Sequence, residues 1–220
     1  MKHFVAVAGN IGVGKSSLVE KIANIQGWQA YFEPVAENPY LEDFYENMQA
    51  WAFQSQVFFL SHRLSMHLDL LENPKSVIQD RSVYEDAEIF AANLFQQGQM
   101  SERDYSSYSK LYGLLSDMLR PPDLVIYLRA SVPVLQSRIA ARGRDFESNI
   151  DDQYLEQLNQ LYEDWINNFS LCPVLTVPTD KMDFVAHNGH LELIVAKMQE
   201  KLTGKEEVVF TPEELRSFAD

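Results

Sequence analysis

One segment near the start of the chain, residues 9–16 with the sequence GNIGVGKS, restricts its fold more than any other. It matches the pattern G-x-x-x-x-G-K-[ST], in which a glycine-rich loop between a strand and a helix surrounds phosphate groups with backbone N–H groups. The flanks agree with that context, because residues 4–8 form an apolar run typical of a buried strand and residues 17–25 have the pattern of a helix. The alternative is a glycine-rich turn that matches the pattern by accident, but an accidental match would not require a strand before it and a helix after it. We therefore predict a phosphate-binding loop that comprises Gly9, Asn10, Ile11, Gly12, Val13, Gly14, Lys15, Ser16 and Ser17.

Composition limits the remaining possibilities. The chain has 220 residues, enough for one sizeable α/β domain, and 46% of them are hydrophobic, which predicts a packed core. No apolar run approaches the roughly 20 residues of a membrane span, and the N-terminus leads directly into the first strand, so we expect no signal peptide. The single cysteine, Cys172, indicates a reducing compartment, and we expect the cytoplasm. A net charge of −14 argues against nucleic acid and anionic membranes as partners, so the positive charge of a phosphate site must be concentrated locally.

The rest of the sequence alternates strand-like and helix-like segments. Short apolar runs predict further strands at residues 28–32, 76–79, 124–128 and 174–177. Helical patterns cover residues 41–71 (with a break near 48–51 as an open alternative), 84–97, 101–120, 132–141, 151–169 and 190–202. Continuous apolar strands separated by helices predict an α/β fold, with a five-stranded parallel sheet covered by helices on both faces. We expect residues 1–203 to form a single domain and residues 204–220 to form a charged tail with a short helix after Thr211.

The ends of the second and third predicted strands carry acidic residues. Ligands of such sheets bind outside the carboxyl ends of the strands. Asp80 ends the third strand and is expected to hold Mg²⁺ together with Ser16, although a helix N-cap is the alternative; Arg81 follows it and can reach a phosphate or an attacking hydroxyl. Glu33 ends the second strand, and Pro34 keeps its backbone extended. A carboxylate there can accept the proton of an attacking hydroxyl, whereas a solvated loop acid is the alternative.

Two further groups of residues complete the predicted site. Arg138, Arg142 and Arg144 concentrate positive charge in an acidic protein, and we interpret residues 138–150 as a lid that closes over a transferring phosphoryl group. An ordinary solvated helix face, paired with nearby acids, is the alternative. The other group can recognise the edge of a nucleobase, because it combines an amide, a guanidinium and a carboxylate with an aromatic wall. The group comprises Trp51, Phe53, Gln56, Arg63 and Asp86, with Phe58 and Phe90 as further apolar walls. On their own, these residues would be interpreted as core aromatics and surface polar groups.

These motifs together resemble the deoxyribonucleoside kinases, in order and over residues 9 to about 169. The resemblance rests on the phosphate-binding loop, on FEPV at residues 32–35, on DRS at residues 80–82 with Asp86 after it, and on Arg138, Arg142-Gly143-Arg144 and Glu147. It implies the P-loop kinase fold with an arginine lid, and transfer of the γ-phosphoryl group of ATP to the 5′-hydroxyl of a deoxyribonucleoside, with Mg²⁺ required. It also implies a homodimer that associates through helices.

The resemblance further implies a role for each matching residue. Glu33 would be the general base, and Arg81 would hold the 5′-oxygen and the phosphates. Tyr45 and Glu147 would hold the 3′-hydroxyl of the sugar, and Val35 would line the same substrate site. The base would be recognised by Gln56, Arg63, Asp86 and Phe90.

Two departures from the family pattern concern the substrate. Asp80 replaces the Glu of many animal members, and Ser55 stands where the deoxycytidine kinase branch carries an aromatic residue that stacks on the base. The pocket there is expected to be wider, or else filled from elsewhere. A wider pocket and the Arg63/Asp86 pair suggest a purine, and the Asp-Arg-Ser form resembles the small bacterial deoxyadenosine/deoxyguanosine kinases, so we expect deoxyadenosine first, then deoxyguanosine or deoxycytidine.

Two other functions compete with this one. A nucleoside monophosphate kinase such as thymidylate kinase shares the fold but carries an Arg where this chain has Phe32. A kinase-like subunit without activity would usually lack Lys15, Glu33 or a lid arginine, and all of these are present.

Overall fold

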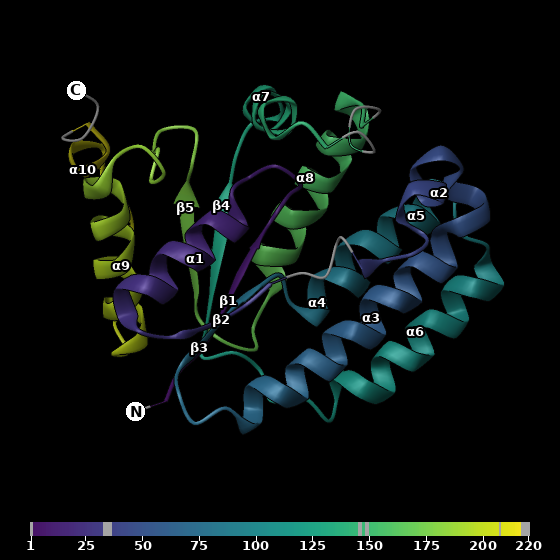
Figure 1. Ribbon diagram of the computed structural model, residues 1–220, viewed down its shortest axis with the longest axis horizontal. Helices are drawn as coiled ribbons and strands as arrows, with labels where there is room; N and C mark the ends of the chain where they lie inside the picture. The colour runs from purple at the N-terminus through teal and green to yellow at the C-terminus, as the bar shows by residue number, and fades with distance from the viewer. Residues whose placement is uncertain (1, 33–36, 145–146, 148–149, 207, 217–220) are drawn as a thin grey trace.

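A five-stranded parallel sheet forms the centre of the molecule (Figure 1). The structure is a computed structural model that describes residues 2–32, 37–144, 147, 150–206 and 208–216. The strands are β1 Phe4–Gly9, β2 Gln29–Tyr31, β3 Val77–Asp80, β4 Leu124–Arg129 and β5 Val174–Pro178, in the spatial order β2-β3-β1-β4-β5. Every neighbouring pair is parallel, with Val5 beside Ile78 on one side and Leu124 on the other. The predicted α/β fold is confirmed, and each strand lies within two residues of its expected bounds.

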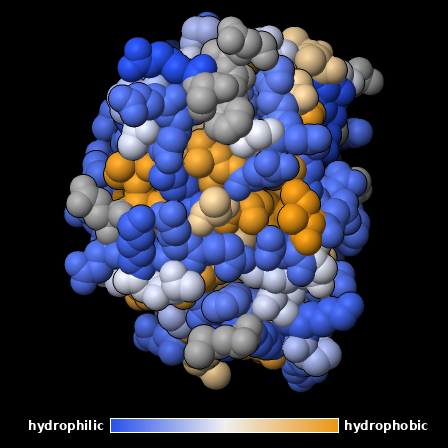
Figure 2. All heavy atoms as spheres, turned by 90° about the vertical axis from the view of Figure 1, so that its left-hand side faces the viewer, coloured by the Kyte–Doolittle hydropathy of each residue, from blue (hydrophilic) through white to orange (hydrophobic). Residues whose placement is uncertain are grey.

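Helices cover both faces of this sheet, which explains why β1 and β3 are buried throughout. All six residues of β1 and all four of β3 are buried. Helices α1 (Lys15–Gln26) and α9 (Asn188–Leu202) lie on one side, at the left of Figure 1, and α8 (Asp152–Asn168), α3 (Met48–Glu72) and α6 (Glu102–Ser116) lie on the other. The α1–α9 side is largely hydrophilic, with apolar side chains gathered near its middle (Figure 2). No helix in the described ranges is long and apolar enough to cross a bilayer.

The predicted helix over residues 41–71 is divided in two. Helix α2 (Leu41–Glu46) ends at Asn47, whose backbone is extended at φ −147° and ψ 83°. The Asn47 side chain then accepts a hydrogen bond from the backbone N–H of Ala50 at 3.2 Å, which caps the N-terminus of α3. The break considered from sequence is therefore confirmed, and a capping residue causes it.

The sequence predicts one regular helix after β3, over residues 84–97, but the structure has three shorter helical segments there. The chain begins as α4 (Val83–Glu85), widens into a π-helix, η2 (Asp86–Ala91), and continues as α5 (Ala92–Gln96). A π-helical turn contains an extra residue, so it changes which side chains share a face. Periodicity in the sequence gives no sign of this change, and it occurs at two of the residues assigned to the substrate site, Asp86 and Phe90.

Three later helices can be compared with their predicted bounds. Helix α6 ends at Ser116 rather than at Arg120, because residues 117–119 form turns before Pro121 and Pro122. Helix α7 (Val132–Arg142) ends at Gly143, which has φ 65° and donates its backbone N–H to Ile139 O. The short α10 (Pro212–Arg216) has the expected cap, since Thr211 and Glu214 exchange backbone-to-side-chain hydrogen bonds. An ion pair of 2.7 Å between Lys197 and Glu214 attaches it to α9.

Candidate active site

The phosphate-binding loop connects β1 to α1, as the sequence predicts. Gly9 has φ 144°, and a Cβ there would lie 2.6 Å from Leu128 O. Gly12 has φ 80°, and a Cβ there would lie 2.7 Å from Cγ1 of Ile139. Any side chain at either position would be strained and would displace the neighbouring strand or helix. The loop geometry therefore requires these two glycines.

Hydrogen bonds hold the loop in shape. Lys15 is buried, and its Nζ donates to Gly9 O at 2.9 Å and to Asn10 O at 3.0 Å. The side chain of Asn10 donates to Leu155 O at 2.9 Å and to Asn159 Oδ1 at 2.8 Å, so the loop is attached to α8. The ammonium group of Lys15 thus lies inside the loop that a phosphate would occupy.

Ser16 and Asp80 meet at the carboxyl edge of the sheet. The Ser16 hydroxyl donates to Oδ2 of Asp80 at 2.5 Å, and Oδ1 of Asp80 is buried with no hydrogen-bond partner in the described part of the chain. Asp80 ends β3 and Ser16 opens the first turn of α1. Two hard oxygen donors side by side, one of them with a buried oxygen left over, suit a small divalent cation.

Arg81 adopts a strained backbone conformation. Its φ of 66° is the one positive value at a non-glycine position among the residues that the structure describes. Such a conformation costs on the order of 1–3 kcal/mol, so surrounding contacts must hold it. The Arg81 N–H donates to Val7 O at 2.9 Å, and Arg63 Nη1 donates to Asp80 O and Arg81 O. The turn directs the guanidinium over the ring of Phe90, with Cζ 4.1 Å from the ring centroid, and Nη1 donates to the Tyr162 hydroxyl at 3.3 Å.

Arg63 and Asp86 form a buried ion pair beside this turn. Arg63 Nε donates to Asp86 Oδ2 at 2.9 Å, and Nη2 donates to Oδ1 at 3.1 Å. Asp86 lines the cavity described below, whereas Arg63 is 1% exposed and is not among the described residues that line it. The structure therefore brings the pair together as predicted, and it places Arg63 behind Asp86.

A single cavity of about 870 Å³ joins the phosphate-binding loop to an apolar pocket between α2, α3 and η2. Tyr45, Gln56, Asp86 and Phe90 line the pocket end. Side chains not predicted from sequence also line the cavity, and they are Leu41, Phe44, Phe59, Tyr154 and the segment Met182, Asp183, Phe184 and Val185. Phe184 lies against the loop, since a Cβ on Gly14 would be 3.2 Å from its Cζ. Glu33 and Val35 lie outside the described residues.

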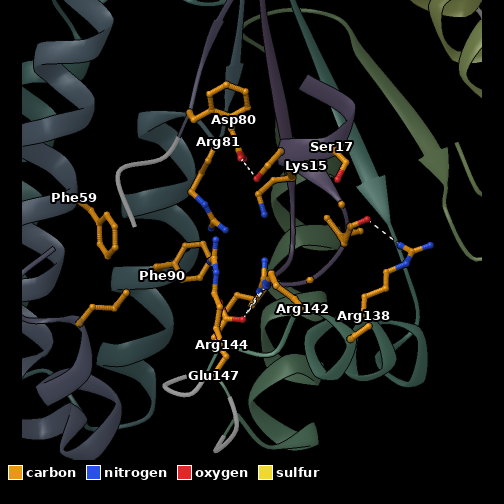
Figure 3. Close-up of a pocket in the computed structure, with 18 of the residues that line it drawn as sticks. Lys15, Ser17, Phe59, Asp80, Arg81, Phe90, Arg138, Arg142, Arg144 and Glu147 are labelled. Atoms are coloured by element: carbon orange, nitrogen blue, oxygen red, sulfur yellow. Dashed lines mark hydrogen bonds and ion pairs between the residues drawn. The ribbon is translucent and has the colours of Figure 1, made fainter. Parts of the chain in front are cut away.

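The three lid arginines do not act together. Arg142 donates to Oε2 of Glu147 through Nε at 3.0 Å and Nη2 at 2.5 Å, and Arg144 Nη1 donates to Oε1 at 3.3 Å. Arg138 instead donates to Val13 O at 2.9 Å and to Thr179 O at 3.0 Å. The side chains of Lys15, Arg81, Arg142 and Arg144 point toward the middle of the cavity from different elements (Figure 3). The acidic chain thus gathers its positive charge where a polyanion would bind.

A buried carboxylate that the sequence analysis missed lies beneath this cluster. Glu85 is 0% exposed; its Oε1 accepts from Gly9 N–H at 3.2 Å and from the Tyr162 hydroxyl at 2.8 Å, and its Oε2 accepts from Ser82 N–H at 2.8 Å. Burial raises the pKa of Glu85, and the nearby Arg81 and Lys15 oppose that rise. Burial likewise raises the pKa of Tyr154 to about 12. The S-x-x-E spacing of Ser82 and Glu85 is a capping-box signal that could have revealed the carboxylate.

Comparison with known proteins identifies the family. The family model described as deoxynucleoside kinase matches residues 5–203. This chain belongs to the deoxynucleoside kinase family. A deoxyadenosine/deoxycytidine kinase of Bacillus subtilis is 36% identical over 193 residues, which cover 87% of this chain and 89% of that protein. A deoxyguanosine kinase of the same organism is 37% identical, with 90% and 96% covered.

Solved structures of this kinase family agree with the fold. A deoxyadenosine kinase from M. mycoides, solved with the products dCMP and a flexible dCDP, superposes with a TM-score of 0.80 at 32% identity. The match covers 90% of this chain and 99% of that one. The same kinase with bound dATP superposes with a TM-score of 0.79.

Proposed function

We propose that this chain is a cytoplasmic enzyme that transfers the γ-phosphoryl group of ATP to the 5′-hydroxyl of a deoxyribonucleoside. The observation that carries the proposal is the single cavity, which has a phosphate-binding loop at one end and a pocket lined by Gln56, Asp86 and Phe90 at the other. Phosphoryl transfer needs the donor phosphate and the acceptor hydroxyl held in line, and a continuous cavity allows that. Relatives named deoxyadenosine, deoxyguanosine and deoxycytidine kinases support the same reaction.

The donor end supplies positive charge and N–H groups to the triphosphate. Backbone N–H groups of the loop and the N-terminus of α1 surround the β- and γ-phosphates, and Lys15 exchanges its loop carbonyls for phosphate oxygens. Arg142 and Arg144 are close enough to Glu147 to form ion pairs with it, and they stabilise the charge that spreads over the transferring group. Phe184, which lies against Gly14, and Val185 line the same cavity, and in this proposal they form the wall against which the donor base lies.

Ser16 and Asp80 would hold Mg²⁺. The hydroxyl and the unpartnered buried oxygen of Asp80 fit such an ion, as described above. When bound, Mg²⁺ neutralises charge on the β- and γ-phosphate oxygens.

The acceptor end binds the nucleoside. Arg81 projects from its strained turn between the loop and Phe90, so it is placed to hold the 5′-oxygen and a phosphate together. Glu33 is the general base by its position in the sequence motif, and Tyr45 and Glu147 contact the sugar. Gln56 and Asp86 offer an amide and a carboxylate to the base, while Arg63 fixes the orientation of Asp86 through two hydrogen bonds.

Deoxyadenosine is the preferred substrate in this proposal. Ser55 is fully buried, accepts a hydrogen bond from Asn38 at 3.1 Å and is not among the described residues that line the cavity. The preference is therefore supported by relatives named deoxyadenosine kinases. Deoxyguanosine and deoxycytidine are the next candidates.

Turnover with each of the four deoxynucleosides tests the proposal. ADP release should depend on the nucleoside, deoxyadenosine should have the highest kcat/KM, and mass spectrometry should identify the 5′-monophosphate. ADP release with dTMP but with no deoxynucleoside would instead establish the monophosphate kinase alternative, which the curated relatives do not favour.

We further propose that the enzyme is a homodimer that associates through α3 and α6. These helices lie side by side (Figure 1), and they expose Leu68 (60% exposed), Leu111 (41%) and Leu114 (72%). Light scattering after size exclusion should give twice the mass of the 220-residue chain. Leu114→Glu should give the monomer mass, whereas Leu171→Glu, at an exposed apolar position outside these helices, should leave the dimer intact. A monomeric wild type would contradict the proposal.

A further inference from the structure

Glu85 connects three parts of the active site that are far apart in the sequence. Its Oε1 accepts from the backbone N–H of Gly9, the first residue of the phosphate-binding loop, and from the Tyr162 hydroxyl on α8. Its Oε2 accepts from Ser82 through both the backbone N–H at 2.8 Å and the hydroxyl at 3.2 Å, directly after the strained Arg81. Each carboxylate oxygen thus receives one backbone N–H and one hydroxyl.

The same carboxylate orients the side chain of Arg81 through the Tyr162 hydroxyl. Tyr162 donates its proton to Glu85, which leaves its oxygen lone pairs for Arg81 Nη1. Glu85 and Tyr162 are both fully buried, so water does not substitute for either contact. The carboxylate also lies near two cations that line the cavity, Lys15 and Arg81.

We propose that Glu85 is a positioning residue that holds the phosphate-binding loop and the Arg81 turn in one fixed arrangement, so that donor phosphate and acceptor hydroxyl stay aligned. The proposal rests on the proposed function, and it adds a residue that touches neither substrate. A carboxylate is required because an amide has a single oxygen. In a Glu85→Gln variant the amide oxygen can accept from the N–H of Gly9 or from that of Ser82, but not from both. The NH₂ group would face the other N–H, so that hydrogen bond would be lost.

Glu85→Gln should therefore reduce kcat while both KM values stay nearly constant. We expect a loss in kcat of about 10- to 100-fold, the effect of displacing reacting groups by a fraction of an ångström to 1 Å. The KM values for ATP and for the nucleoside should change by less than about threefold, since the contacts with both substrates are retained. A merely structural role would instead lower the melting temperature and the amount of active protein without changing kcat per active site.

Glu163→Gln is the matched control. Glu163 also accepts a hydrogen bond from a tyrosine hydroxyl, that of Tyr127 at 3.0 Å, and it pairs with Arg129 at 2.8 Å, but it is a third exposed and outside the cavity. It should keep the wild-type kcat. If Glu85→Gln fails to fold, Tyr162→Phe is the second variant. It removes the Tyr162 hydroxyl, which is one of the four donors to Glu85 and the acceptor of the hydrogen bond from Arg81. It should lower kcat by about threefold at constant KM.

Hydrogen exchange tests the same proposal without turnover. Peptides that contain Gly9 and Ser82 should lose protection in Glu85→Gln and keep it in Glu163→Gln. Unchanged protection together with unchanged kcat in Glu85→Gln would overturn the proposal. A loss of kcat in Glu163→Gln as large as that in Glu85→Gln would also overturn it. A wild type that phosphorylates no deoxynucleoside would refute the proposed function instead, and the exchange measurement would still decide whether Glu85 holds the two segments.

Discussion

The two ends of the cavity are built in different ways. The phosphate-binding part of the donor end is a backbone structure made from nine successive residues, and its shape depends on glycines and on carbonyls that accept from Lys15. The acceptor end is made of side chains from three separate elements, α2, α3 and η2, which are spread over residues 41–91. Phosphates are the same in every nucleotide, so fixed backbone groups suffice for them. Bases differ at their edges, and only side chains supply donors and acceptors that distinguish them.

This contrast predicts that changes at the donor end affect all nucleosides equally, whereas changes at the acceptor end alter their ranking. Lys15→Met should lower kcat/KM by about 10³-fold for every deoxynucleoside, because a charge that stabilises the transferring group is lost. Lys21→Met, on the same helix but outside the cavity, is the control. A ranking of nucleosides that changes in Lys15→Met would break the comparison.

Asp80→Asn should be the next largest donor-end effect. Loss of the carboxylate charge weakens the predicted Mg²⁺ site, so the Mg²⁺ concentration for half-maximal turnover should rise about 10- to 100-fold. Turnover measured over a range of Mg²⁺ concentrations, with each nucleoside in turn, gives this half-maximal concentration, and its rise should be the same for all nucleosides. Wild-type Mg²⁺ dependence would show that Asp80 is only a hydrogen-bond partner of Ser16.

Gln56→Leu tests the acceptor end. The side chains have similar size, but Leu offers no hydrogen bond, so kcat/KM for the preferred nucleoside should fall by about tenfold and less for the others. Gln54→Leu, exposed on the same helix, should change nothing. Equal losses for all four deoxynucleosides would place Gln56 outside base recognition.

The smallest effect concerns pH and stability. Because burial raises the pKa of Glu85 in the folded state, the folded chain binds more protons than the unfolded one between the unfolded pKa of about 4.3 and the raised value. The wild type therefore loses stability as pH rises through that window, and Glu85→Gln does not. The melting temperature of the variant, relative to the wild type, should increase with pH and then level off. A constant difference would show that Glu85 has an ordinary pKa.

The sequence was sufficient for the phosphate-binding loop and for the fold. The glycine pattern, the flanking strand and helix, and the residue types at the strand ends are local features, and they predicted the loop, the Ser16–Asp80 contact and the parallel sheet. The sequence was insufficient where distant side chains combine. Nothing in the spacing of residues places Phe184 against Gly14, or makes Arg138 bond to Val13 O while Arg142 and Arg144 share Glu147.

The π-helical turn at Asp86–Ala91 has a consequence for how this pocket can change over time. One surplus residue in a regular helix would rotate all later side chains by about 100° about the helix axis, and a π-turn absorbs that surplus locally. Asp86 and Phe90, four residues apart, both line the cavity within this turn, and α5 follows directly after it. Losing a single codon here would therefore convert the π-turn into a regular α-helical turn while α4 and α5 keep their places, so evolution can change the spacing of side chains in this pocket by deletion, without replacing any amino acid.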